Sequence, residues 1–456
     1  MAGLDPPLPQ PIDPPIRSKE AAHGGRPLPL AAGFPNTTEP TRGGWAVNRN
    51  RSQGRHVPRR TLIGGALITS ALLAVGVVAL GGFIPNTRFS SQYASGQYLE
   101  DGGHIGVTAD FEPCEALVVG GSELVVRNPG LLAELVEKVA GKTPILCLVS
   151  NPHHMLRLQE RLQRRGVTPG AVDFAQLPYQ SRWVRDFGPL FVRQADGSLG
   201  IVDPHFSRPG REREDHLPRY LAGYFRLPLT EMPLVLEGGN LLSNGCGLYI
   251  STHRVAARNQ GEGHSVRAMQ QLMRDYCEVQ QWVGVKPLVG EPTGHIDIFA
   301  AFVAPDLAVV AALDPAADAE NATRLDEAAR RLAGLETPAG PLRVARVPMG
   351  DCSDGVWRTY TNVLFCNGTL LVPQYARASA ATDRRALEVY RHLLPTWDVV
   401  GIDCEEIIAD GGSLHCLAIQ VPQLPPGDPL HLTWSASIPP IAWKHGARRA
   451  MTVPAG

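Results

Sequence analysis

The chain has 456 residues, which is long for a single average domain and ample for a large buried core. Hydrophobic residues make up 44% of it and charged residues 19%, as in an ordinary globular protein. The formal net charge is -1 at pH 7, so no global field attracts nucleic acid or an anionic membrane, and any preference for a charged ligand must come from local side chains.

The first 60 residues predict a disordered region rich in proline and arginine. Ten prolines fall within the first 40 positions, with scattered glycine and arginine and no periodic apolar face. Such a composition buries too little apolar surface to offset the entropy cost of ordering the chain.

Residues 61–84 form an uncharged segment whose apolar heart runs from Leu62 to Phe83, after a cluster of five arginines. About 20 apolar residues span a bilayer as a helix, and arginines on the N-terminal side favour the cytoplasm. We therefore expect one hydrophobic helix that contacts the membrane through 62–83 if it is retained, and a membrane-anchored or secreted protein whose folded part lies outside the cytoplasm.

Two alternatives for this segment stay open, a retained anchor and a cleaved export signal. The run is long for a signal core and no clear A-x-A site follows it, while 59–63 weakly resembles a twin-arginine signal. A buried core helix is a third reading, which the many small residues and the absence of charge disfavour.

After a predicted linker at 85–104, the chain alternates short β-rich runs with amphipathic helices as far as about residue 425, and 426–456 reads as a C-terminal tail. Predicted strands cover 115–120, 144–149, 199–203, 248–252, 307–311 and 369–373. Predicted helices centre near Leu158, Tyr220, Met269, Glu327 and Val389.

These five helices recur roughly every 50 to 60 residues, which predicts an α/β fold and suggests a propeller-like or repeat architecture. A doubly wound sheet would give a similar alternation. No G-x-G-x-x-G sequence opens a helix after a strand and no Walker loop is present, so nucleotide binding has no support.

The eight cysteines form no CxxC pair and no cluster with zinc-finger spacing. Most are expected to be small buried hydrophobes. A disulfide is compatible with an exported protein, but its connectivity cannot be read from the spacing. We predict no metal and no cofactor.

Four short motifs carry the chemistry, in the order W-V-R-D-F-G-P (183–189), L-E-G-G-N (236–240), P-T-G-H-I-D (292–297) and G-G-S-L-H-C (411–416). Together they supply a cysteine, a histidine and several carboxylates beside glycine or proline. A thiol that attacks a cationic planar carbon needs a nucleophile, a proton carrier and anions that hold the cation. The inventory therefore indicates an enzyme acting on guanidinium groups.

Cys416 closes the turn at Gly411 and Gly412 before an apolar strand-like run, where glycine permits close approach of a substrate. By itself it would be an inert buried cysteine. His295 and Asp297 lie two residues apart, so on a strand both would face one cavity. The alternative is a structural histidine with a surface aspartate.

Asp186 lies in a segment with aromatic neighbours, of which Trp183 offers a face that attracts cations. The alternative is a turn aspartate paired with Arg182 or Arg185. Glu237 follows an apolar run and precedes two glycines, which places it at a strand end, either in the cavity or in a simple turn.

In these motifs the chain resembles the agmatine deiminase and Porphyromonas-type peptidylarginine deiminase family, whose members read W-x-R-D-x-G-P, E-G-G-N, G-H-x-D and G-G-x-x-H-C in this order. The resemblance also includes A-D-F-E-P-C-E-A (109–116) and Y-T-N-V-L-F-C-N-G (360–368), and it covers about 320 residues. It implies the pentein fold, a five-bladed pseudosymmetric α/β propeller, for a catalytic domain at 105–425.

Carried over by motif, the resemblance implies that Cys416 is the nucleophile and His295 the acid and base. The guanidinium would bind to Asp186 and Asp297, and Asn362 would lie in the pocket. The role of Glu237 is less defined. A thiouronium intermediate on sulfur would then be hydrolysed to a ureido product, without a metal.

The substrate expected first is peptidyl-arginine, which would give peptidyl-citrulline and ammonia. The export segment favours it, and so does F-S-R-P-G-R-E-R-E-D (206–215), whose Arg208 and Arg211 resemble arginines that could bind a substrate carboxylate. A solvated charged loop is the plainer reading of that stretch. The alternative substrate is agmatine, giving N-carbamoylputrescine for putrescine biosynthesis.

Two other classes fit less well. A cysteine peptidase would need an oxyanion hole in place of two substrate-facing carboxylates. A non-catalytic propeller binding protein should lack the set of cysteine, histidine and aspartate that is intact here. The oligomeric state cannot be predicted from the sequence.

Overall fold

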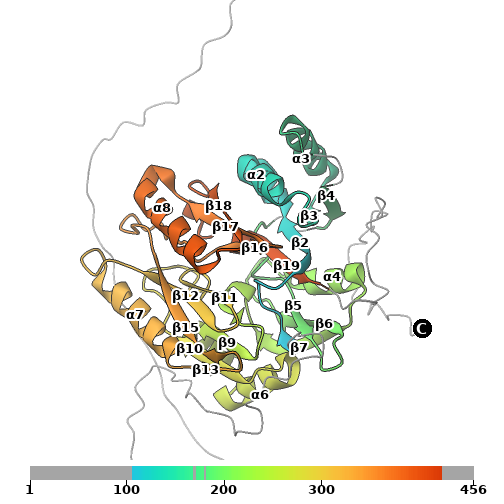
Figure 1. The fold of residues 1–456 in the computed structure, drawn as a ribbon. Coiled ribbons are helices and arrows are strands. Elements are labelled where there is room, and N and C mark those ends of the chain that lie inside the picture. The colour runs from blue at the N-terminus through green and yellow to red at the C-terminus, as the bar shows by residue number, and fades with distance from the viewer. Residues whose placement is uncertain (1–104, 168–170, 179–180, 424–456) are drawn as a thin grey trace, which may run out of the picture. The chain divides into compact units, whose positions relative to one another are not determined.

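The computed structural model describes residues 105–423 except 168–170 and 179–180 (Figure 1). The predictions for 1–60, 61–84, 85–104 and 426–456 concern residues outside this range. Within it, no helix is both long and apolar enough to span a bilayer.

The α/β class predicted from the sequence is confirmed, and the described residues form five separate sheets of three or four strands besides one short strand pair. Five sheets rule out the single doubly wound sheet. Four of them have the same order of elements along the chain. An antiparallel strand pair is followed by helix and then by a third strand that is parallel to the second.

The first of these units has the strand order β1-β5-β6-β7. It comprises β1 (Gly106–Val107), β5 (Leu190–Arg193), β6 (Leu199–His205), η2 (Glu214–His216), α4 (Leu217–Phe225) and β7 (Leu229–Val235). The next comprises η3 (Gly238–Asn240), β8 (Leu242–Ser243), β9 (Leu248–Thr252), α5 (His253–Gly261), α6 (Val266–Cys277) and β10 (Gln281–Val285).

The third unit comprises β11 (Ala300–Ala304), β12 (Leu307–Ala312), α7 (Ala319–Ala333) and β15 (Arg343–Pro348), with the short pair β13 (Glu336–Thr337) and β14 (Gly340–Pro341) inserted before β15. The fourth comprises β16 (Leu364–Cys366), β17 (Thr369–Gln374), α8 (Ala376–Leu393), β18 (Asp398–Asp403) and η4 (Ile408–Asp410).

The fifth unit joins the two ends of the described chain. Strand β19 (Ala418–Pro422), preceded by η5 (His415–Leu417), pairs antiparallel with β2 (Cys114–Gly120), and the two lie side by side in Figure 1. The sheet continues in parallel to β3 (Ile145–Val149) and β4 (Val172–Gln176). Its helices are α1 (Gly121–Arg127), α2 (Pro129–Val139) and α3 (Pro152–Arg164).

Local sequence explains where several helices begin. The Asn151 side chain accepts hydrogen bonds from the backbone N–H groups of His153 and His154, with Pro152 in the first helical turn of α3. Ser265 and Asp318 cap α6 and α7 in the same way. Strand β3 is a continuous run of buried apolar residues, because both faces of its sheet are packed at that strand.

Candidate active site

Five segments supply the candidate site, and each lies a few residues before a strand of an antiparallel pair in one of the five units. Asp186 precedes β5, Asn240 precedes β8, Asp297 precedes β11, Asn362 precedes β16 and Cys416 precedes β19. The segment at the same position in each unit therefore contributes residues to a single candidate site.

Hydrogen bonds join these five segments in a closed ring. Most run between backbone groups, and the Thr361 hydroxyl supplies the link from the third unit to the fourth. Arg185 N donates to Cys416 O at 3.3 Å, Gly238 N to Asp186 O at 3.3 Å, Asp297 N to Gly239 O at 3.2 Å, Thr361 Oγ1 to Asp297 O at 3.2 Å and His415 N to Asn362 O at 3.2 Å.

The thiol of Cys416 lies inside this ring, and the residue is 5% exposed. Its Sγ is 3.3 Å from Asn362 Nδ2 and 3.6 Å from Asp297 Oδ2. Burial, followed by the charges of Asp297 and Asp186, raises the pKa of the Cys416 thiol well above its usual range. With no substrate bound, the sulfur is therefore held as a thiol.

The two aspartates each present a carboxylate oxygen that is ready for a ligand. Asp297 is fully buried and Asp186 is 7% exposed. The Oδ1 atoms of both accept no hydrogen bond from the residues that the structure describes. A buried anionic oxygen without a donor is costly, so the pair favours a ligand with several N–H groups and a positive charge.

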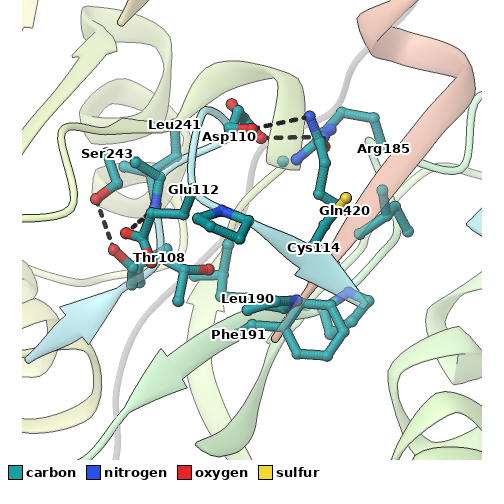
Figure 2. A pocket seen from close by; sticks show the side chains of 17 residues that line it. Thr108, Asp110, Glu112, Cys114, Arg185, Leu190, Phe191, Leu241, Ser243 and Gln420 are labelled. Carbon is teal, nitrogen blue, oxygen red and sulfur yellow. Dashed lines mark hydrogen bonds and ion pairs between the residues drawn. The ribbon is translucent and has the colours of Figure 1, made fainter. Parts of the chain in front are cut away.

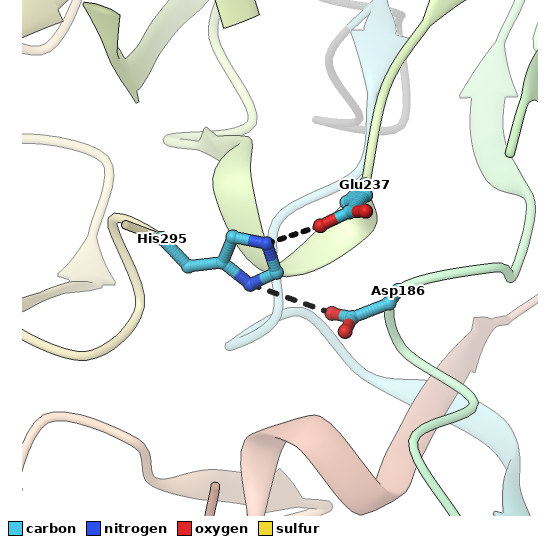
Figure 3. A group of neighbouring side chains, drawn as sticks. All are labelled: Asp186, Glu237 and His295. Carbon is cyan, nitrogen blue, oxygen red and sulfur yellow. Dashed lines mark hydrogen bonds and ion pairs between the residues drawn. The ribbon is translucent and has the colours of Figure 1, made fainter. Parts of the chain in front are cut away.

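His295 lies between Glu237 and Asp186, as Figure 3 shows. Its Nε2 is 2.6 Å from Glu237 Oε2, and its Nδ1 is 3.5 Å from Asp186 Oδ1. Burial opposes the charged ring, but Asp186 and the hydrogen bond to Glu237 outweigh it and raise the pKa of His295 to about 9. The imidazole therefore carries a proton at neutral pH.

Arg208 completes this group by holding Glu237 with two hydrogen bonds of 2.6 Å each. Burial alone would raise the pKa of Glu237, but the hydrogen bonds from Arg208 and His295 lower that pKa to about 2. Burial raises the pKa of Asp186. Glu237 is thus the fixed anion of the group, and Asp186 is the acid that gains most from an incoming cation.

Gly239 keeps the centre of the site open. A Cβ atom on this residue would lie 2.7 Å from His295 Nδ1, 2.9 Å from Asp186 Oδ1 and 3.0 Å from Asp297 Oδ2. Any side chain there would collide with all three groups. The same distances show that the two aspartates and the histidine converge on one point.

Gly412 likewise leaves room for the side chain of Trp183 beside the site. A Cβ atom there would lie 2.6 Å from the Trp183 ring and 3.2 Å from Cys416 Cβ. The indole therefore lies close to the thiol across this glycine. The guanidinium of Arg182 covers the same ring, 4.7 Å from its centroid.

Some local expectations from the sequence are wrong. His295 and Asp297 lie in the turn before β11 and not on a strand, and the turn brings their side chains together instead. The alternative pairing of Asp186 with an arginine of its own motif also fails, because Arg182 binds Asp410 and Arg185 pairs with Asp110.

The two arginines predicted to bind a substrate carboxylate are both engaged with acids of the chain. Arg208 is held by Glu237, and Arg211 pairs with Glu214 and donates to Ser181 at 2.9 Å. Arg211 also lies over the ring of Phe206, 5.1 Å from its centroid. A substrate carboxylate would have to displace these partners.

Two residues of the site were given no role from the sequence. His415 lies between Asp297 and Asp110, and both of its ring nitrogens contact a carboxylate. Both His415 and Asp110 lie in motifs that carry the family resemblance. A linear pattern does not indicate, however, that residues some 300 positions apart are in contact.

Asp186, Glu237 and His295 could also hold a metal, since their ligand atoms lie within 4.8 Å of one another. Arg208, however, already supplies a positive charge to both oxygens of Glu237. The donor set therefore needs no metal for charge balance, and it suits an organic cation bound by Asp186 and Asp297.

Comparison with known proteins agrees with this geometry. Residues 126–422 match the family described as Porphyromonas-type peptidyl-arginine deiminase. The chain belongs to this family. The resemblance predicted from the motifs is confirmed, and the protein is an enzyme of the agmatine and peptidylarginine deiminase group, a hydrolase acting on the C–N bonds of amidines.

Individual relatives are distant but match over most of their own length. A protein of Pectobacterium atrosepticum, provisionally named an agmatine deiminase, is 25% identical over 323 residues, which are 64% of this chain and 85% of that protein. One from Streptomyces coelicolor with the same provisional name is 29% identical over 284 residues, covering 55% of this chain and 79% of its own.

Solved structures show the same fold. A provisionally named arginine deiminase from Porphyromonas gingivalis matches with a TM-score of 0.60 at 25% identity, over 70% of this chain and 98% of that one. Agmatine deiminase of Enterococcus faecalis matches with a TM-score of 0.58 at 22% identity, over 70% of this chain and 96% of that one.

Proposed function

We propose that this enzyme removes ammonia from a guanidinium group by attack of Cys416 on the guanidinium carbon. The observation that carries the proposal is the pair of buried carboxylate oxygens on Asp186 and Asp297 that accept no hydrogen bond from the described residues and that flank a thiol and a protonated imidazole. A planar cation with N–H groups on several edges fits that pair better than a neutral amide does.

Substrate binding would orient the guanidinium and would also activate the thiol of Cys416. Asp186 and Asp297 accept N–H bonds from the guanidinium and offset its desolvation. The bound cation also lies beside Cys416 and compensates the carboxylate charges that keep the sulfur protonated. Substrate binding therefore lowers the pKa of the thiol and yields the thiolate, the competent nucleophile.

The reaction then proceeds in two halves. The thiolate forms an S–C bond to the guanidinium carbon, and the imidazolium of His295 donates a proton to one nitrogen so that the C–N bond breaks and ammonia leaves. This gives a thiouronium on Cys416. Neutral His295 takes a proton from water, and the resulting oxygen bonds to the same carbon. The C–S bond then breaks as the remaining hydroxyl proton passes to the departing sulfur, which releases a ureido product and the free thiol.

For the substrate we infer agmatine, with peptidyl-arginine as the second candidate. The curated relatives named above carry the provisional name of agmatine deiminase. In addition, Arg208 and Arg211 are occupied by Glu237 and Glu214, and agmatine has no carboxylate that would need them. Peptidyl-arginine is favoured by the family description and by the apolar segment at 61–84.

A substrate panel tests this proposal. Wild-type enzyme is incubated with agmatine, free arginine and peptides that carry internal or C-terminal arginine, and ammonia and the ureido product are measured together. We expect the highest kcat/KM with agmatine. A preference for peptides would select the second candidate, and no turnover of any guanidine would contradict deimination.

We further propose that the five units surround one axis as a five-bladed α/β propeller. The repeated strand order and the ring of hydrogen bonds among equivalent segments support this arrangement. The central site would then be built from one turn of each blade.

For location we propose an extracytoplasmic catalytic domain behind an anchor or export signal at 61–84, supported by the run of uncharged residues and the arginines before it. Fractionation of cells that express the full chain tests this, with the protein expected in the membrane or outside the cell. A full-length soluble product in the cytoplasm would contradict both forms.

A further inference from the structure

His415 lies between two carboxylates, and its own geometry defines its charge. Nδ1 is 2.8 Å from Asp297 Oδ2, and Nε2 is 3.1 Å from Asp110 Oδ2, while the residue is 4% exposed. An ionised carboxylate only accepts hydrogen bonds, so each contact requires an N–H on the ring. A neutral imidazole has one N–H, whereas an imidazolium has two and satisfies both contacts.

The outer carboxylate of this pair is itself held as an anion. Asp110 Oδ1 is 3.2 Å from Arg185, which also contacts Gln420, and Figure 2 shows Asp110 and Arg185 together at the wall of a pocket. Burial acts to raise the pKa of Asp110, but Arg185 and His415 outweigh it and lower that pKa. Asp110 is therefore a permanent negative partner for the imidazole.

The charged groups facing His415 come from three segments, and they do not all act alike. Burial and Arg185 disfavour the charged ring, while Asp110 and Asp297 favour it, and the net effect raises the pKa of His415. Asn362 contributes its backbone oxygen, which accepts from His415 N at 3.2 Å. The ring is thus fixed in place as well as charged.

The contacts of His415 extend through Asp297 to the sulfur of Cys416. Asp297 Oδ2, the oxygen bound by His415, is also the oxygen 3.6 Å from Cys416 Sγ. His415 and Cys416 are adjacent in sequence and share η5. A positive charge on His415 therefore offsets the anion that most directly opposes a negative charge on the sulfur.

We propose that His415 is a positioning residue, an imidazolium fixed by Asp110 that binds Oδ2 of Asp297, leaves Oδ1 for the guanidinium and favours the thiolate of Cys416. The proposal rests on the proposed function, in which Cys416 is the nucleophile. It extends the site outward to Asp110, Arg185 and the pocket of Figure 2, whose lining includes neither Cys416 nor Asp297.

Alkylation of Cys416 tests the proposal without any substrate. Iodoacetamide forms an S–C bond with the thiolate and releases iodide, and quantitative mass spectrometry of the peptide containing Cys416 gives the rate constant from pH 6 to 10. In His415→Asn the cation is lost while an amide donor remains. We expect alkylation to slow about tenfold at pH 8, because the thiol becomes harder to ionise.

Asp110→Asn separates action through His415 from direct action on the sulfur. Removing an anion would by itself favour the thiolate and speed alkylation. If Asp110 acts by keeping His415 charged, the single variant is instead slower than wild type, by a smaller factor than His415→Asn. In the double variant, Asp110→Asn then causes no further slowing.

The control is His392→Asn at the exposed end of α8, which should alkylate at the wild-type rate. Thermal melts establish that each variant is folded, and Asp110→Asn keeps the test decisive if His415→Asn does not fold. Wild-type alkylation rates in His415→Asn, or faster alkylation in Asp110→Asn, would overturn the proposal. Failure of the proposed function would appear separately, as absence of ammonia release by wild-type enzyme.

Discussion

The chemistry of single residues here depends on which charges are already paired. Arg208 compensates the charge of Glu237, and His415 contacts Asp297, whereas one oxygen of Asp186 and one of Asp297 accept no hydrogen bond from the described residues. In the proposed function these two oxygens, rather than the number of acids, define where the guanidinium binds. Together with burial, Asp297 and Asp186 raise the pKa of the Cys416 thiol in the empty site.

Asp186→Asn tests this at the first of the two oxygens. The variant removes a buried charge that the empty enzyme pays to desolvate, so its melting temperature should be unchanged or higher. Charge-assisted hydrogen bonds are worth about 1.5–3 kcal/mol, so affinity for the guanidine should fall by about 10- to 100-fold. Thermal melts beside a substrate titration measure both effects, and unchanged affinity would contradict the role of Asp186.

The proton on His295 should depend on Glu237. In Glu237→Gln the charged acceptor is lost, so the pKa of His295 falls from about 9. As the pH rises, the imidazolium then loses its proton at a lower pH than in wild type. Since ammonia departure needs that proton, the alkaline limb of the kcat profile should move to lower pH. Glu406→Gln, at an exposed position, is the matched control and should keep the wild-type profile.

An alkaline limb that does not move in Glu237→Gln would show that His295 is not the acid of the rate-limiting step.

At this scale the sequence predicted residue types better than contacts. Cys416, His295, Asp186 and Asp297 were identified because each lies in a recognisable motif beside glycine. The contact between Asp110 and His415 was missed because it joins positions 305 apart in the chain, which no local pattern contains.

At the scale of elements, the site is made by turns that precede strands. The sequence predicted six of the nineteen described strands and five of the eight described α-helices, because apolar runs and amphipathic stripes follow from burial alone. It placed His295 and Asp297 on a strand, where alternation would align them. The turn before β11 achieves the same convergence, and a turn leaves no periodic signature.

Gly239→Ala tests how closely the turn η3 approaches the site. The new methyl group would lie within 3.0 Å of His295, Asp186 and Asp297, so the groups must separate and activity should fall by at least about tenfold. The matched control is Gly223→Ala in α4, where a Cβ meets nothing within 4 Å.

The control should retain full activity and gain about 0.5–1 kcal/mol of stability, as alanine favours a helix over glycine. Wild-type turnover in Gly239→Ala would place the substrate away from this glycine.

At the scale of the whole described chain, the first and last strands meet in one sheet and the equivalent turns meet in one ring. These long-range pairings, such as β19 with β2 and β1 with β5, were not predictable, because the sequence shows no identity between units. What was predictable is the period of 50 to 60 residues, and five sheets account for it. One consequence is that every unit must fold for the site to exist.

The most direct test of the central claim is mass spectrometry of enzyme quenched in acid during turnover of agmatine or, if the panel selects it, an arginine peptide. Covalent attack by Cys416 predicts that the peptide containing Cys416 gains the mass of the substrate less ammonia in wild type, that Cys416→Ala carries no such addition, and that this variant releases no ammonia above background. Turnover at a wild-type rate by Cys416→Ala, or an adduct on a different residue, would contradict the account.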